Sequence, residues 1–325
     1  MKRIQSLVLI LLLFGISWLS LNTGFTKLDN IFGLLLGQGD QSDVYIAQEI
    51  RAPRVLAAIL VGATLGIAGS LSQGVLRNPL AEPVLLGTTG GAALASLLGV
   101  LFFNVTLGSL SAIALSILGA LLATFFTFQV GKFGKNGLAF VVMGVAVSAT
   151  LTAFVGITAV LINKPEARGV TFWALGTLSM TVKSQLQLIA PILLISWFLA
   201  VRIASNLDYL ALGDTRARHL GKNVNRIRFY VFIIIAISVG CITSVFGQIS
   251  FLALATPHIV RSIFGPKHKS LVVNSGILGA IILVLADLLA RSFSNQNELP
   301  LGLMTSLIGA PVLIVATRKW LRANA

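Results

Sequence analysis

Long apolar runs alternate with short polar intervals along the whole chain. A helix that crosses the hydrocarbon core of a bilayer needs about 20 mainly apolar residues, and the pattern predicts about ten such spans. They lie near residues 4–22, 55–76, 84–103, 108–130, 138–162, 186–204, 229–246, 250–264, 272–290 and 301–317. We therefore expect an all-α membrane protein with a single transmembrane domain over residues 1–325.

The first and eighth runs each allow a second interpretation. The first follows Met1-Lys2-Arg3, as the apolar part of a secretory signal peptide would. Because no small-x-small cleavage site comes after it, we interpret it as the first span. The eighth run is short and contains Pro257, which predicts a bend or a break in that helix.

The longest strongly polar interval is Asn206–Arg228, in which Asp208 and Asp214 are the only acids. Its basic residues are Arg216, Arg218, Lys222, Arg226 and Arg228. Since every long apolar run lies before or after this interval, we expect a loop that the membrane part presents on one side.

The centre of this loop has the pattern of a short helix. Gly213 and Gly221 bracket a segment long enough for two helical turns. Leu212 and Leu220 stay apolar in this polar setting, and Ala217 between them is small. Such a segment suits contact with another protein. The alternative is a solvated basic loop that follows the positive-inside rule.

Composition and charge agree with a multi-span membrane protein. Of 325 residues, 56% are hydrophobic and only 10% are charged, whereas soluble domains carry roughly 25% charged residues. The net charge of +14 indicates no nucleic acid here, because Lys and Arg gather on the cytoplasmic side of membrane proteins. With ten spans, 17 Lys and Arg residues fall on the side of the N-terminus and seven on the other. Both termini are therefore predicted to be cytoplasmic.

No catalytic, metal or nucleotide site is recognisable. The three histidines have no Cys or carboxylate at metal-ligand spacing, and the chain contains no G-x-x-x-x-G-K-[ST] phosphate loop. Asp287 is the one acid well inside an apolar run, and Arg291 follows it by one helical turn. We interpret this pair as a structural salt bridge, with a proton relay as the alternative.

Chemistry at the predicted outer side is limited to three arginines. Arg51, Arg54 and Arg291 lie on the face that carries fewer positive charges, which favours a docking site for acidic groups. Snorkelling of each side chain to the interface is the alternative. Gly62 and Gly66 form a G-x-x-x-G motif, which we interpret as close helix packing.

Several longer motifs, taken together, resemble one family. They are RAPRVLAAILVGATLGIAG (51–69), QGVLRNPLAEPVLLG (73–87), LGDTRARHLG (212–221), GQISFLALATPHIVR (247–261), ADLLAR (286–291) and ELPLGLMTSLIGAPV (298–312). In type and order they resemble the FecCD-type permeases of type II ABC importers for iron–siderophore complexes, haem and vitamin B12.

The resemblance implies a set of partners in a bacterial cytoplasmic membrane. A second permease subunit, the same or a sister chain, would share one translocation path with this chain within membrane lipid. Two cytoplasmic subunits would bind ATP, so this chain would need no cofactor of its own and would not be an enzyme. The coupling residues would be Gly213, Ala217, Leu220 and Gly221, set in a groove of the ATPase.

The resemblance also assigns the outer face. Arg51, Arg54 and Arg291 would pair with glutamates of an extracytoplasmic substrate-binding protein or lipoprotein. The expected cargo is an iron(III)-siderophore or a related iron chelate, with haem or cobalamin as the alternative. The chain departs from the family pattern at Ala253, where a glycine is more frequent, and at 266–269, which lack an acid.

Two other classes of function stay open on the residues alone. An ion-coupled secondary transporter would need a relay of buried acids, for which Asp287 gives little support. An intramembrane enzyme would need paired catalytic groups at membrane depth, and none is visible. Transport driven by a partner is the reading that the residues favour.

Overall fold

A computed structural model describes residues 2–131, 137–161, 172–292 and 299–311. The helices are α1 (Lys2–Asn22), α2 (Ile31–Leu35), α3 (Gln41–Tyr45), α4 (Ala52–Leu76), α5 (Thr88–Phe103), α6 (Leu110–Gly131), α7 (Gly137–Leu161), α9 (Lys183–Ala211), α10 (Asp214–His219), α11 (Val224–Phe246), α12 (Leu252–Phe264) and α13 (His268–Ser292). A π-helical turn over Ile46–Arg51 leads into α4, a 3-10 turn over Pro83–Leu86 precedes α5, and one further helix covers Leu301–Pro311. Within these described ranges there is no β-strand.

The predicted all-α, multi-span architecture is confirmed. Seven of the described helices are long and apolar enough to cross a bilayer, and three shorter apolar helices accompany them, over Thr88–Phe103, Leu252–Phe264 and Leu301–Pro311. Each predicted interval falls on one of these helices. Residue 162 of the fifth predicted span and residues 312–317 of the tenth lie outside the described residues, as do both chain ends. The cytoplasmic placement of the termini therefore stays a prediction.

Several helices are longer than the apolar runs that predicted them, and α9 and α11 show why. The sixth run was predicted over 186–204, but α9 continues to Ala211 because Leu207 and Leu210 still bury their side chains completely. The seventh run was predicted from 229, but α11 begins at Val224. There the Asn223 side chain accepts a hydrogen bond from the Arg226 N–H (3.1 Å), which caps the helix start.

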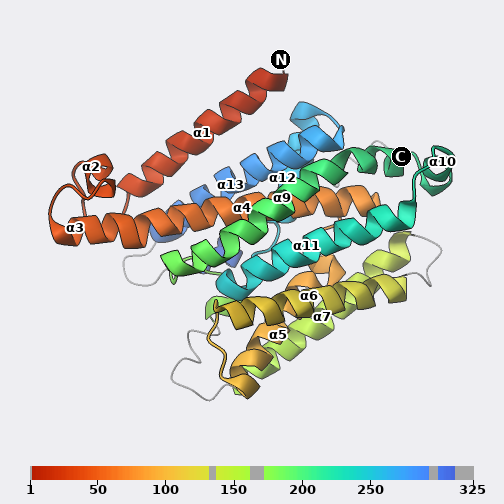
Figure 1. Cartoon of the computed structure of the whole chain (residues 1–325), viewed down its shortest axis with the longest axis horizontal. Helices are drawn as coiled ribbons and strands as arrows, with labels where there is room; N and C mark the ends of the chain where they lie inside the picture. The colour runs from red at the N-terminus through yellow and green to blue at the C-terminus, as the bar shows by residue number, and fades with distance from the viewer. Residues whose placement is uncertain (1, 132–136, 162–171, 293–298, 312–325) are drawn as a thin grey trace.

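α4 lies at the centre of the bundle, where it contacts α9, α11, α12 and α13 (Figure 1). Its glycines permit this. A Cβ added at Gly62 would overlap the backbone of Gly279, and one at Gly66 would overlap that of Ser275, both on α13. The predicted role of the G-x-x-x-G motif in close helix packing is thus confirmed. Gly69, one turn further on, meets Ala253 of α12 in the same way.

Of the bend or break predicted at Pro257, the break is not present, because α12 runs without interruption from Leu252 to Phe264. Burial of the first half of α12 against α4 holds it, and the Gln73 side-chain amide donates to the Leu254 carbonyl oxygen (3.3 Å). Neighbouring helices of this kind let a membrane helix tolerate proline.

The two ends of the bundle differ in what they carry. Figure 1 shows α2 and α3 at one end of α4 and α10 at the opposite end of the molecule. Following the predicted charge asymmetry, we call the end with α2 and α3 the outer end and the end with α10 the inner end. The long helices between them present many exposed apolar side chains, including most of those on α1.

Candidate functional site

The inner end carries the coupling segment, which we define as residues 212–221. The short helix predicted between the two glycines is present as α10, and both glycines have positive φ (100° at Gly213, 74° at Gly221). After α10 the Gly221 N–H donates to Arg218 O (2.9 Å) and the Lys222 N–H donates to Ala217 O (3.0 Å). This pair of bonds is the Schellman motif, in which glycine takes the left-handed position at the helix end. The sequence therefore fixes both boundaries of α10.

The predicted coupling residues differ in exposure. Leu212 and Leu220 are 50% and 55% exposed, whereas Ala217 is fully buried. Ala217 packs into a cluster with Leu210 and Val224, so its side chain faces the chain's own core and not an outside partner. A contact with another protein at this segment would therefore use the leucines, while Ala217 seats α10 on α9 and α11.

Ion pairs fasten the coupling segment to the bundle. Asp214 Oδ1 lies 3.0 Å from Arg77 Nη2, and Asp214 Oδ2 lies 3.0 Å from Arg228 Nη1. Arg77 follows the last residue of α4, where it takes positive φ (52°) and caps that helix. As the first residue of α10, Asp214 also sits favourably at the positive end of the helix dipole.

A second acid, six residues before Asp214, joins α9 to α13. Asp208 Oδ1, on α9, accepts a hydrogen bond from the backbone N–H of His268 (3.1 Å) and lies 2.7 Å from His268 Nδ1. His268 is the first residue of α13, so Asp208 caps that helix from outside. Sequence reasoning identified Asp208 and Asp214 as the only acids of the interval but did not find their partners. Arg77 and His268 lie outside the interval, and Arg228 lies at its end.

At the outer end, an ion-pair cluster surrounds Asp287. The carboxylate of Asp287 lies 2.9 Å from Arg54 Nη2 and 3.2 Å from Arg291 Nε. The side chain of Asp287 is 1% exposed, and those of Arg54 and Arg291 are 12% and 11% exposed. The predicted salt bridge between Asp287 and Arg291 is therefore confirmed. Arg54 is a further member that the sequence did not reveal.

The remaining arginine contacts of the outer end hold the loop after α1. Arg51 Nη1 donates to Leu21 O (2.8 Å), and Arg51 Nη2 donates to Thr26 O. Arg291 Nη2 donates to Ser20 Oγ (2.6 Å). The Arg51 guanidinium also lies within 3 Å of where a Cβ at position 24 would be, so a side chain there would displace it from these carbonyl oxygens.

Arg51, Arg54 and Arg291 line one pocket of about 500 Å³ at the outer end, so the structure brings the predicted docking residues together. Arg54 and Arg291 pair with the carboxylate of Asp287, whereas the Arg51 guanidinium bonds to backbone carbonyl oxygens, so positive charge exceeds negative charge among these four side chains and favours an acidic group at the mouth of the pocket. However, the guanidinium groups are largely buried and bonded to Asp287 and to backbone carbonyls. Docking through these arginines stays a prediction.

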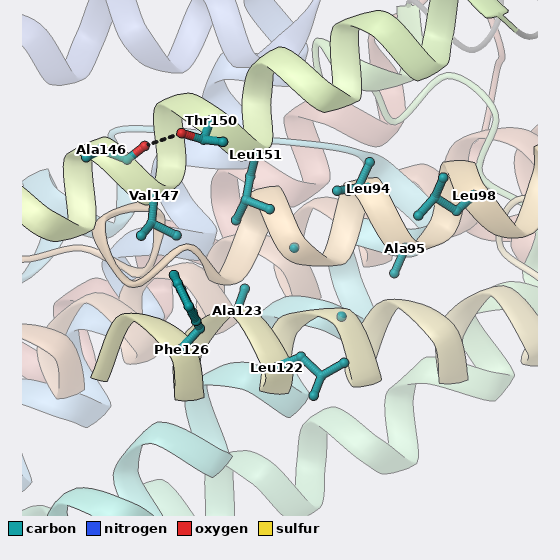
Figure 2. Close-up of a pocket in the computed structure, with 12 residues that line it drawn as sticks. Leu94, Ala95, Leu98, Leu122, Ala123, Phe126, Ala146, Val147, Thr150 and Leu151 are labelled. Atoms are coloured by element: carbon teal, nitrogen blue, oxygen red, sulfur yellow. Dashed lines mark hydrogen bonds between the residues drawn. The ribbon is translucent and has the colours of Figure 1, made fainter. Parts of the chain in front are cut away.

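A third feature is an apolar groove of about 470 Å³ between α5, α6 and α7. Figure 2 shows Leu94, Leu122, Phe126 and Leu151 among the side chains that line it. The one hydroxyl in its lining belongs to Thr150, which donates to Ala146 O (2.9 Å). The groove thus offers hydrophobic surface and no free polar group that could recognise a particular cargo.

Among the residues that the structure describes, no three His, Cys, Asp or Glu side chains gather in a way that could hold a metal ion. The features with functional character are therefore the coupling segment at the inner end and the arginine pocket at the outer end.

Comparison with known proteins identifies a matching family and several similar proteins. The model of the FecCD transport family matches residues 7–319. The iron(3+)-hydroxamate import system permease protein FhuB of Bacillus subtilis is 35% identical over 275 residues, covering 84% of this chain and 71% of that protein. The hemin transport system permease protein HmuU of Yersinia pestis is 34% identical over 274 residues, covering 83% of this chain and 82% of that protein.

A solved structure has a similar fold over almost the whole chain. It belongs to a transporter assigned to the metal-chelate type of ABC transporters, captured in an inward-facing conformation. The two chains superpose with a TM-score of 0.85 at 27% identity, covering 98% of this chain and 99% of the other.

Proposed function

Because the chain belongs to the FecCD transport family, we propose that it is the transmembrane permease subunit of a binding-protein-dependent ABC importer in a bacterial cytoplasmic membrane. The single observation that carries this proposal is the coupling segment. It is a short capped helix with two exposed leucines at one end of a membrane bundle, in a chain without a phosphate-binding loop. Such a chain offers the two exposed leucines as a contact for an ATPase but has no phosphate-binding loop for ATP.

The proposed partners follow from the two ends of the bundle. Two cytoplasmic ATP-binding subunits bind the coupling segments of a permease dimer, and ATP therefore binds outside this chain. A substrate-binding protein docks at the outer end, where Arg51, Arg54 and Arg291 supply positive charge. Closure of the ATPases moves the coupling segments, and the helices then release cargo inward, which is a population shift between two states.

The proposed cargo is an iron(III)-siderophore or a related iron chelate. Two relatives support a chelate-sized cargo, one named for iron(3+)-hydroxamate and one for hemin. Haem is the alternative cargo, and cobalamin is a second alternative. The only side-chain hydroxyl in the lining of the apolar groove between α5, α6 and α7 is that of Thr150, which donates to Ala146 O, so the groove favours none of these cargoes over another.

A co-purification experiment tests the ATPase contact. We expect the double variant Leu212→Asp/Leu220→Asp to lose its partner ATPase, because charges replace the exposed apolar contact of the coupling segment. Val182→Asp is the matched control: Val182 is similarly exposed (52%) but lies at the start of α9, far from α10. Retention of the ATPase by the double variant would contradict the proposal.

A transport assay separates this function from an ion-coupled transporter. Vesicles that hold the permease, the ATPase and the binding protein should accumulate ferric chelate only when ATP is supplied. Ionophores that collapse ion gradients should have no effect. Accumulation by vesicles with the permease alone would overturn the proposal. Parallel binding assays of the cognate binding protein with a ferric hydroxamate, haem and cobalamin would identify the cargo.

A further inference from the structure

We propose that α4 and α13 form a single two-helix strut that joins the coupling segment to the outer arginine pocket, with Asp208 and Asp214 as the fasteners at its inner end. When the binding protein docks at the outer end, the strut would transmit that change to the ATPase. When the ATPase moves, the strut would transmit that movement to the outer end. The inference rests on the proposed function, because it assigns a mechanical role within that transport cycle.

The inner end of the strut is fixed by two acids that reach different helices. Asp214, at the start of α10, pairs with Arg77 at the end of α4 (3.0 Å). Asp208, near the end of α9, caps the start of α13 through the N–H of His268 (3.1 Å). The polar interval has no other acid. Asp214, which also pairs with Arg228 of α11 (3.0 Å), joins the coupling segment to α4, and Asp208 joins the preceding end of α9 to α13.

The middle of the strut is in direct backbone contact. Gly62 faces Gly279, and Gly66 faces Ser275, so closely that a Cβ at either α4 position would overlap the α13 backbone. Helices that touch through their backbones have few side chains between them that could rearrange. We therefore expect α4 and α13 to move together and not to slide past each other.

The outer end of the strut is fixed by a buried ion pair between the same two helices. Arg54 of α4 and Asp287 of α13 meet at 2.9 Å, and the Asp287 side chain is 1% exposed. Arg291 of α13 completes the cluster and lines the outer pocket with Arg54. A change in the outer pocket therefore acts on α4, which pairs with the coupling segment through Arg77, and on α13, which is joined through Asp208 to the end of α9 that precedes the segment.

The experiment removes the inner fasteners in the assembled transporter. Asp214→Asn and the double variant Asp208→Asn/Asp214→Asn are reconstituted with the ATPase and the binding protein. ATPase co-purification, basal ATP hydrolysis and transport per ATP hydrolysed are measured. We expect stimulation by the binding protein and transport per ATP to fall by about five-fold or more, the lower range of a typical coupling energy. Co-purification of the ATPase should fall far less than in Leu212→Asp/Leu220→Asp, because the two exposed leucines remain. Asp214→Glu, which keeps the carboxylate, should restore most of the coupling.

The partner residue and a control sharpen the test. Arg77→Gln should lower coupling, and the double variant Arg77→Gln/Asp214→Asn should be no worse than Asp214→Asn alone, because Asp214→Asn already breaks the link to Arg77 together with the link to Arg228. Glu49→Gln removes an exposed acid in the turn before α4 that pairs with Lys183 at 3.5 Å and forms none of the links of the strut, and it should leave coupling unchanged.

Three results would overturn the inference. Full coupling in Asp208→Asn/Asp214→Asn would show that the fasteners transmit nothing. Loss of the ATPase from that variant would show that the acids only shape the docking surface. Additive effects of Arg77→Gln and Asp214→Asn would show independent roles. If instead the wild-type chain binds no ATPase, the proposed function itself fails, which separates the two failures.

Discussion

Ion pairs between aspartate and arginine hold both ends of the bundle, but they are buried to different extents. At the outer end an aspartate that is 1% exposed binds two arginines that are 12% and 11% exposed. At the inner end Asp214 is 28% exposed and binds Arg77 and Arg228, which are 40% and 20% exposed. A buried ion pair is costly to break because one charge stays unpaired in the interior, whereas an exposed pair can exchange partners with water. The outer cluster is therefore suited to a fixed joint, and the inner one to a joint that adjusts when a partner binds.

The largest expected effect is at the outer joint. Asp287→Ala leaves Arg54 and Arg291 buried beside a missing acid, and should lower the free energy of unfolding in mixed micelles by about 3–5 kcal/mol. A control that replaces all three residues, Arg54→Met/Asp287→Leu/Arg291→Met, should lose much less, because no unpaired charge remains. A loss below about 1 kcal/mol in Asp287→Ala would remove the contrast in depth between the two ends.

The next effect separates the two faces of the coupling segment. Ala217→Leu forces extra volume into a fully buried site, and overpacking of that kind should cost about 1–3 kcal/mol of unfolding free energy. It should also displace α10 and weaken ATPase co-purification. Leu220→Ala, on the exposed face, should leave the unfolding free energy within about 0.5 kcal/mol and weaken only co-purification. Equal stability of the two variants would show that Ala217 does not seat α10.

The fold and the positions of the coupling segment and the outer arginines could be predicted from the sequence. The burial of their side chains could not. The apolar runs gave the helices because a membrane span must be long and apolar, and Gly213 and Gly221 gave α10 because a left-handed helix end favours glycine. Ala217 was predicted as a coupling residue, but nothing in the local pattern shows which way a single small residue faces.

The pairings across the bundle could not be predicted for a physical reason. The link from Arg54 to Asp287 and that from Arg77 to Asp214 join residues far apart in the chain, and they depend on how α4 packs against its neighbours. Only the Asp287–Arg291 pair was found, because four-residue spacing on one helix is a local signal. A lone acid in an apolar run does predict a buried cation nearby, and that signal could have pointed to Arg54.

A smaller effect is expected at the inner joint when stability alone is measured. Asp214→Asn should lower the unfolding free energy by less than about 1 kcal/mol, because its partners are partly solvated and salt screens them. When both variants are measured in the same micelles, the difference between their losses of unfolding free energy compares the exposed ion pair with the buried one. A cost as large as that of Asp287→Ala would mean that the inner joint is as rigid as the outer one, and the contrast between the two ends would be lost.

The smallest effect tests whether position or burial sets the strength of the outer joint. Glu49 and Lys183 also form an ion pair in the outer half of the molecule, but at 3.5 Å and with side chains 39% and 58% exposed. Holding two long, solvated side chains in one geometry costs entropy that offsets most of their attraction. Glu49→Gln should therefore change the unfolding free energy by about 0–0.5 kcal/mol, and by less at high salt. If it costs several kcal/mol, the strength of the Asp287 cluster comes from the outer location and not from burial.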